Sequence, residues 1–151
     1  MRPNAFIRIS NRPVTALLRA GAPMGSMALL TVRGRRTGSP QTTPVTLTPE
    51  GGGWVLGSPF GETDWVKNLR AARVGTITRR RREVEVLASE MEAGEAARIM
   101  MENMAGVGPV ARRALAPYFS IPLDAPLEDW LVEAPRHPMF RLVRPKPWPA
   151  Q

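Results

Sequence analysis

The residues with the clearest potential for chemistry lie in one short segment, Gly34 to Gly38, which reads Gly-Arg-Arg-Thr-Gly. A β-like apolar run, Met27 to Arg33, leads into this segment, and a second β-like run, Thr42 to Thr48, follows it. Glycine lets the backbone approach an oxyanion closely, and guanidinium and main-chain N–H groups donate hydrogen bonds to it. The segment therefore predicts an anion-binding hairpin loop that suits a phosphate.

Composition narrows the chemistry that the chain can perform alone. Among 151 residues there is no cysteine, which excludes disulfides, thiolate metal sites and cysteine nucleophiles. The single histidine, His137, argues against a histidine metal cluster or a Ser-His-Asp triad, so we expect no metal site. Difficult chemistry would therefore need an organic cofactor. The net charge of +8 indicates an anionic partner, although a GC-rich genome would also favour arginine.

Several elements must position the loop. We expect a short leading helix from the cap at Asn11 to the stop at Gly21, and a helix that Thr63 caps. A third helix carries the apolar stripe Ala97, Met100, Met101 and Met104 and ends at Gly106. Weaker helical segments cover 110–116 and 127–131. The remaining predicted strands are Trp54 to Ser58, Val74 to Thr78, Glu83 to Leu87 and Met139 to Val143, and the second and third of these flank the four arginines 79–82.

Short strands joined by turns, with helices between some of them, predict a mixed α+β fold that is mainly β. We expect a small closed or split antiparallel β-barrel of about six strands with peripheral helices. A doubly wound parallel sheet is disfavoured, because only turns separate the first three strands. We interpret residues 1–151 as a single domain. It divides into an N-terminal helical arm (1–25), the barrel with its helices (26–144) and a Pro-rich tail (145–151).

Two separated motifs carry a resemblance to a known family. The first is Leu29-Leu-Thr-Val-x-Gly-Arg-Arg-Thr-Gly-x-Pro40, with Thr43-Pro44 after it, and the second is Trp65-Val-Lys-Asn68-Leu69. Together they resemble the deazaflavin-dependent nitroreductases, which are split β-barrel proteins of the FMN-binding-like superfamily that use coenzyme F420. The resemblance covers about Met27 to Leu87, with a looser echo at 138–142.

The resemblance implies specific roles for individual residues. Arg36, with the backbone of Thr37 and Gly38, would lie against the cofactor phosphate, and Ser58 would lie near the same anionic tail. The implied cofactor-binding set is Arg35, Arg36, Thr37, Gly38, Thr43, Pro44, Ser58, Trp65 and Asn68. Trp65 would border the deazaflavin and substrate cavity, and Asn68 would help to fix the cofactor. Core packing remains the alternative role for Trp65.

The same resemblance implies an oxidoreductase. It would transfer hydride from reduced F420 to a small hydrophobic acceptor: a quinone, as in a quinone reductase, an enone or a nitro compound. We expect a cytoplasmic location, because the apolar stretch 20–32 is too short to span a bilayer and the N-terminal segment has no signal-peptide apolar region. Tyr118, the only tyrosine, is the candidate catalytic residue because its phenol could donate a proton; its alternative role is to cover a helix end. FMN is the alternative cofactor.

Two departures from the family pattern keep a second function open. Gln41 and Pro59 stand where many members carry basic residues, which favours a non-enzymatic carrier of a flavin, deazaflavin or lipid as the alternative. Arg33, Lys67 and Arg70 are the candidates to compensate. The arginines 79–82 predict a solvated hairpin tip, or a guide for the anionic tail of the cofactor. We expect no specific nucleic-acid partner, because few aromatic residues lie among them. Membrane contact by the basic N-terminus and the oligomeric state stay open.

Overall fold

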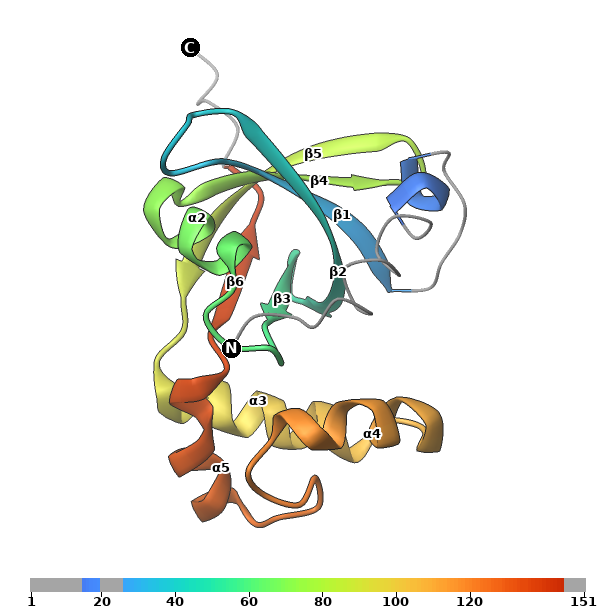
Figure 1. Ribbon diagram of the computed structural model, residues 1–151, viewed down its shortest axis with the longest axis vertical. Helices are drawn as coiled ribbons and strands as arrows, with labels where there is room; N and C mark the ends of the chain where they lie inside the picture. Colours follow the sequence, from blue (N-terminus) through green and yellow to red (C-terminus); the bar gives the residue numbers. More distant parts are fainter. Residues whose placement is uncertain (1–14, 20–25, 146–151) are drawn as a thin grey trace.

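Six antiparallel strands close into a barrel in a computed structural model of the protein, which describes residues 15–19 and 26–145. Around the barrel the strands follow the order β1-β2-β3-β6-β5-β4, so the last strand along the chain lies between β3 and β5 (Figure 1). The predicted barrel of about six strands is confirmed. The strands are β1 (Met27–Arg33), β2 (Pro40–Glu50), β3 (Gly53–Gly57), β4 (Val74–Arg79), β5 (Arg82–Glu90) and β6 (Met139–Val143).

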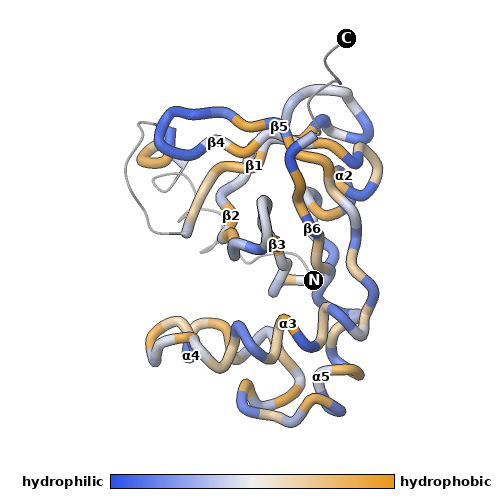
Figure 2. The backbone as a smooth tube through the Cα atoms, turned by 180° about the vertical axis from the view of Figure 1, so that it is seen from behind, coloured by the Kyte–Doolittle hydropathy of each residue, from blue (hydrophilic) through white to orange (hydrophobic). Residues whose placement is uncertain are grey.

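Alternation along the strands places apolar side chains in the interior of the barrel. In β1, Ala28, Leu30 and Val32 are buried and belong to one core cluster together with Leu56 of β3 and Phe140 of β6. The apolar stretches of β1 and β6 are visible in Figure 2. Side chains of a strand point alternately to its two faces, so every second residue of these strands fills the barrel.

Strand β2 is longer than the predicted run Thr42 to Thr48 and contains three prolines. Its pairing with β3 begins only at Leu47, so Pro44 has a partner strand on the β1 side alone. A proline lacks the N–H that a second partner would require, which explains why the strand is unpaired there. Glu50 pairs with Gly53, so only Gly51 and Gly52 form the turn between β2 and β3.

Gly53 is required by close packing of two strands. A Cβ at this position would lie 2.0 Å from the backbone carbonyl oxygen of Leu142 in β6. Nothing lies within 4 Å of a Cβ placed at the neighbouring Gly52. The pairing of β3 with β6 therefore requires glycine at position 53 but not at position 52.

The hairpin of β4 and β5 is tighter than the predicted turn of four arginines. Arg79 and Arg82 are paired, which leaves only Arg80 and Arg81 in the turn, with φ of 51° and 64°. Two-residue hairpins favour this left-handed backbone because it matches the twist of the strands, although glycine and asparagine usually occupy it. In β5, Val84 is partly buried and Val86 is buried while Glu83 and Glu85 are exposed, which is the alternation of a half-exposed strand.

Helices pack at two places around the barrel. α2 (Asp64–Ala72) contacts β1, β4 and β5, and α3, α4 and α5 form a separate layer beneath the barrel in Figure 1. That layer has its own apolar cluster around the fully buried Trp130. The elements of this layer are α3 (Ala93–Ala105), α4 (Pro109–Leu115), α5 (Leu127–Glu133) and the 3-10 turns η1 (Ala116–Tyr118) and η2 (Ala134–Arg136).

The predicted helix boundaries agree in part. Gly106 does end α3, and Thr63 does occupy the N-cap of α2, but the Thr63 side chain makes no capping hydrogen bond. Residues 15–19 are helical, while the predicted cap and stop of that helix, most of the arm 1–25 and the tail beyond Pro145 lie outside the described residues. In the described ranges, no helix combines the length and the apolar character needed to cross a membrane.

Candidate functional site

The loop between β1 and β2 is closed by its own backbone. The N–H of Gly34 donates to the carbonyl oxygen of Ser39 at 2.8 Å, and the N–H of Gly38 donates to the carbonyl oxygen of Gly34 at 2.9 Å. Gly38 has a φ of 75°, which glycine adopts at little cost. The N–H of Ser39 donates to the hydroxyl of Thr37 at 3.2 Å. These bonds give the loop a fixed shape before any ligand binds.

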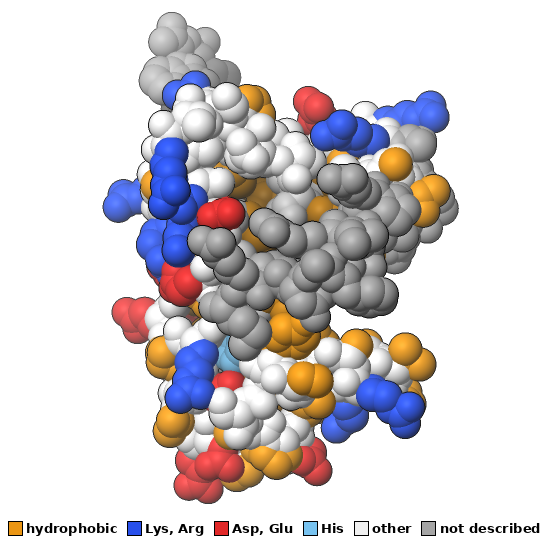
Figure 3. All heavy atoms as spheres, in the orientation of Figure 1, with side chains coloured by type: hydrophobic (Ala, Val, Ile, Leu, Met, Phe, Trp, Pro, Cys, Tyr) orange, Lys and Arg blue, Asp and Glu red, His pale blue; other side chains and the backbone are white. Residues whose placement is uncertain are grey.

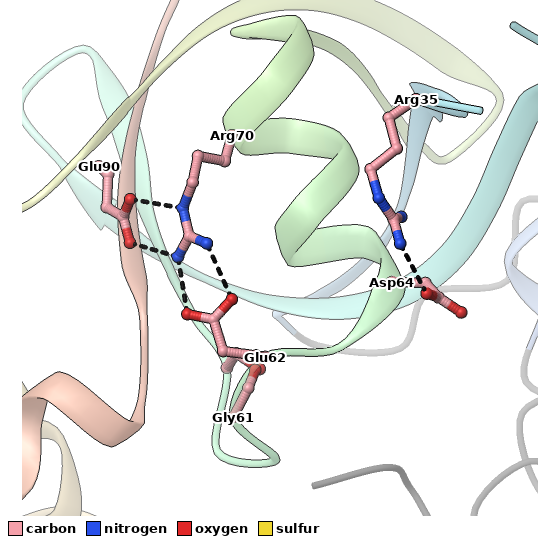
Figure 4. Close-up of polar contacts among 7 residues, drawn as sticks. Arg35, Gly61, Glu62, Asp64, Arg70 and Glu90 are labelled. Atoms are coloured by element: carbon pink, nitrogen blue, oxygen red, sulfur yellow. Dashed lines mark hydrogen bonds and ion pairs between the residues drawn. The ribbon is translucent and has the colours of Figure 1, made fainter.

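Arg35 and Asn68 join the two sequence motifs. The backbone N–H and the guanidinium of Arg35 both donate to the side-chain oxygen of Asn68, at 3.1 and 2.8 Å. Asn68 is buried in α2, and Asp64 at the start of that helix lies 3.5 Å from the same guanidinium (Figure 4). The side-chain oxygen of Asn68 is therefore used to hold the loop against α2.

Arg36 and Thr37 are the members of the loop that keep donors available. Both are exposed, and among the described residues neither of their backbone N–H groups has an acceptor. The guanidinium of Arg36 likewise pairs with no carboxylate in the described part of the chain. Two main-chain donors and one guanidinium at one exposed turn fit the binding of a phosphate.

Arg70 is the centre of an ion-pair cluster and cannot compensate for the basic residues replaced by Gln41 and Pro59. Its guanidinium donates to both carboxylate oxygens of Glu62 and of Glu90, at 2.8 Å in every case (Figure 4). These hydrogen bonds raise the pKa of Arg70 and lower that of Glu62. The cluster ties the loop before α2 to the end of β5.

A cavity of about 540 Å³ lies between the outer face of β2 and β3 and the helical layer. It is mainly apolar on the helical side, where Met100, Met104, Val107, Leu115 and Phe119 line it. We call this cavity the groove. Its strand side is formed by Thr46, Thr48, Val55, Gly57 and Ser58.

We call the loop between β1 and β2, residues 34–39, the arginine loop. The outer face of β2 leads from this loop toward the groove. Val45 and Leu47 are buried in the barrel, so Pro44, Thr46 and Thr48 point outward by the alternation of the strand. Pro44 and Thr48 are about 13 Å apart along the strand. An elongated ligand with an anionic end could therefore hold the loop at one end and reach the groove with the other.

The structure places the predicted site residues in three environments. Arg35 to Gly38 and Asn68 lie together, and Thr43 and Pro44 follow on β2, where they pair with Leu30 and Leu29. Ser58 lies in the wall of the groove, but it is buried and its hydroxyl donates to the carbonyl oxygen of Gly61 at 2.7 Å.

Trp65 and Tyr118 each pack against another aromatic ring. Trp65 packs against the barrel core with its ring centroid 6.1 Å from that of Phe140, and it is not among the described residues that line the groove. The ring of Tyr118 meets Phe60 edge to face at 4.6 Å. Trp65 is only partly buried, so its position is compatible with both of the roles predicted for it.

Sequence reasoning missed a buried polar pair beside the groove. His137 lines the groove, its Nε2 lies 2.8 Å from a carboxylate oxygen of Glu133, and its Nδ1 lies 2.9 Å from the carbonyl oxygen of Pro59. Both residues are buried. Their i, i+4 spacing at the end of a helical segment was the signal that could have found them.

Burial and hydrogen bonding act in opposite directions on the pKa of Glu133. Burial raises the pKa of Glu133, but hydrogen bonds from His137 and from the backbone N–H of Ser120 outweigh it, so the pKa is lowered overall. The carbonyl oxygen of Pro59 only accepts, so Nδ1 carries a proton. The Glu133 carboxylate thus accepts from the backbone N–H of Ser120 and lies against Nε2 of His137.

Comparisons with known proteins agree with this fold. The model of the F420H(2)-dependent quinone reductase family matches residues 5–113. The crystal structure of a putative pyridoxamine 5′-phosphate oxidase from Listeria innocua is similar over 89% of this chain and 92% of its own, with a TM-score of 0.54 and 14% identity. General Stress Protein 26 from Bacillus anthracis is similar over 87% and 85%, with a TM-score of 0.50 and 12% identity. At such identities the likeness concerns the fold alone. A search of curated proteins gave no match.

Proposed function

The chain belongs to the F420H(2)-dependent quinone reductase family, and on that premise we propose that it transfers hydride from reduced F420 to a small hydrophobic acceptor. It is an oxidoreductase, and its cofactor is F420. The finer proposal concerns the acceptor, for which a quinone is the first choice, and the residues that hold the two reactants. An enone or a nitro compound is the alternative acceptor.

The observation that carries the proposal is the arginine loop with its available donors. Arg36 and Thr37 present a guanidinium and two N–H groups that have no acceptor among the described residues. The hydrogen bonds from Arg35 to Asn68 hold the backbone of the loop against α2. A rigid set of donors binds an anion without first paying for its own ordering, so the loop suits the phosphate of F420.

The apolar lining of the groove favours a lipophilic acceptor. Methionine, valine and phenylalanine side chains line its helical side, and methionine adapts its shape to flat or irregular apolar ligands. Bound reduced F420 supplies the hydride; the protein holds the phosphate, orients the acceptor and excludes water. The acceptor then needs a proton. We retain Tyr118 as its proposed donor, because the adjacent Phe119 lines the groove and Phe60 fixes the phenol ring.

The proposal is tested by binding and turnover in the same preparation. The purified protein is titrated with F420 and with FMN, and the oxidation of reduced F420 is then followed with menadione as acceptor. We expect preferential binding of F420 and menadione-dependent oxidation. Arg98→Ala, a change at an exposed arginine of α3, serves as the charge-matched control for Arg36→Ala.

Two results would contradict the proposal. Preferential binding of FMN would assign a different cofactor to the loop. Binding of F420 without turnover by any of a quinone, an enone and a nitro acceptor would favour the carrier, which the replacements Gln41 and Pro59 and the engagement of Arg70 by two carboxylates already motivate.

A further inference from the structure

We propose that the end of the barrel opposite the arginine loop is a second binding site, and that its ligand is a small amphiphilic anion with an apolar body and a terminal carboxylate or phosphate. The site is a cavity of about 650 Å³, a size typical of small-molecule sites. We call it the barrel-mouth cavity. Its lining residues are Trp54, Ile77, Arg79, Arg80, Arg82, Val84 and Arg144.

Strand register separates this cavity from the arginine loop. β1 and β4 are antiparallel, with Leu29 opposite Thr78 and Thr31 opposite Thr76. The end of β1 that leads into the loop therefore lies beside the start of β4, whereas Arg79 lies at the other end of β4. From Val74 to Arg79 the extended strand β4 covers about 17 Å, so Arg79 is separated from the loop by about that distance along the barrel. The cavity is thus a different site from the loop, and its occupant is independent of the proposed function.

The cavity has an apolar floor. Ile77 is fully buried within the barrel core, and Trp54 and Val84 are partly buried and pack against the same core. Each of the three is contributed by a different strand. Such a surface favours a hydrocarbon or aromatic group, because its burial removes apolar area from water.

The rim of the cavity is cationic, and three of its arginines have no carboxylate partner in the described part of the chain. Among the described residues no carboxylate pairs with Arg80, Arg82 or Arg144, whereas Arg70 and Arg141 each hold two carboxylates. Arg144 lies over the ring of Trp54 at 5.7 Å, which orients its guanidinium beside the floor. Figure 3 shows a few basic side chains, with an acidic side chain beside them, at the β4–β5 end of the barrel.

The backbone of the hairpin indicates that arginine is there for a reason other than folding. Arg80 and Arg81 both adopt the left-handed conformation that glycine or asparagine would adopt more easily, and Arg79 faces Arg82 across the strands as a like charge. Both features oppose folding. Backbone strain of this kind tends to occur at functional sites.

The combination of floor and rim selects the ligand class. An inorganic anion would satisfy the guanidinium groups but leave the apolar floor uncovered. A nucleic acid would need a series of stacking surfaces, and the cavity offers one indole. An amphiphile of modest length satisfies both parts, with its oxyanion at Arg80, Arg82 and Arg144 and its apolar body over Trp54 and Val84.

Calorimetric titration of the full chain tests the proposal with soluble probes below their critical micelle concentrations. The probes are octyl phosphate and octanoate, which carry both parts, and inorganic phosphate and 1-octanol, which carry one each. We expect one equivalent of an octyl anion to bind, at least tenfold more tightly than either single-part probe. The preferred headgroup then distinguishes a phosphate ligand from a carboxylate ligand.

Variants at the two ends of the barrel locate the binding. The double variant Arg82→Ala/Arg144→Ala should weaken binding of the octyl anion at least tenfold while its affinity for F420 stays unchanged. Arg36→Ala should do the reverse, so failure of the cofactor proposal and failure of this one remain distinguishable. Equal affinity in the double variant, equal binding of inorganic phosphate alone, or binding only of a single-stranded oligonucleotide would each overturn the proposal.

Discussion

Two neighbouring arginines of one loop should differ in what they do, and their difference can be measured. Arg36 is exposed and has no partner among the described residues, whereas Arg35 is bound to the buried Asn68. We therefore expect Arg36→Ala to weaken the binding of F420 without changing the free energy of unfolding. Asn68→Ala should lower the free energy of unfolding. It should weaken the binding of F420 only indirectly, because the loop loses the contact that holds it against α2.

The expected magnitudes follow from the hydrogen bonds. A hydrogen bond to a charged group contributes about 1.5–3 kcal/mol, so the loss of the Arg36 contact corresponds to an increase of about 10- to 150-fold in the Kd for F420. An exposed substitution without a partner changes the free energy of unfolding by less than about 0.5 kcal/mol. Asn68→Ala deprives two donors of Arg35 of their acceptor and should cost about 1–3 kcal/mol.

The assay combines fluorescence titration with F420 and equilibrium unfolding in urea for the wild type and the variants. Arg98→Ala controls for the loss of one positive charge, and it should change neither quantity. Unaltered affinity in Arg36→Ala would remove Arg36 from the phosphate site. A fall in the stability of Arg36→Ala comparable to that of Asn68→Ala would refute the division of roles between the two arginines.

Three further predictions concern packing, pH and the groove. Gly53→Ala should lower the free energy of unfolding by about 1–3 kcal/mol through its clash with β6, while Gly52→Ala, the matched control, should leave it unchanged or raise it in urea unfolding. Because folding lowers the pKa of Glu133 from its ordinary value of 4.5, its stabilising contribution is complete at neutral pH and is lost as the pH falls below about 4.5. Glu133→Gln should therefore flatten the acid side of the stability–pH curve, and an unchanged curve would contradict the stabilising role of the ionised Glu133. Val107→Trp should narrow the groove and raise the KM for menadione at least severalfold with the Kd for F420 unchanged; an unchanged KM would place the acceptor elsewhere.

Local features of the chain were sufficient to predict most of the framework. Short β-like runs identified β1, β5 and β6, and the apolar stripe of α3 with Gly106 after it identified that helix. The glycines of the arginine loop predicted a tight turn, and Gly38 does adopt a left-handed φ. These features depend on residues close together in the chain, for which pattern and backbone preference decide the conformation.

The amino-acid sequence by itself thus determined the β-barrel pattern and the family, and it predicts the anion-binding chemistry of the loop. Only the tertiary structure decided which arginine is available and which is engaged, because the partner of Arg35 lies 33 residues away and the carboxylates of Arg70 approach from two different elements. It likewise joined His137 to the Pro59 carbonyl across 78 residues and enclosed the groove between β2–β3 and the helical layer. A long polar side chain has many directions open to it, and the acceptor that packing brings within 3 Å selects one of them.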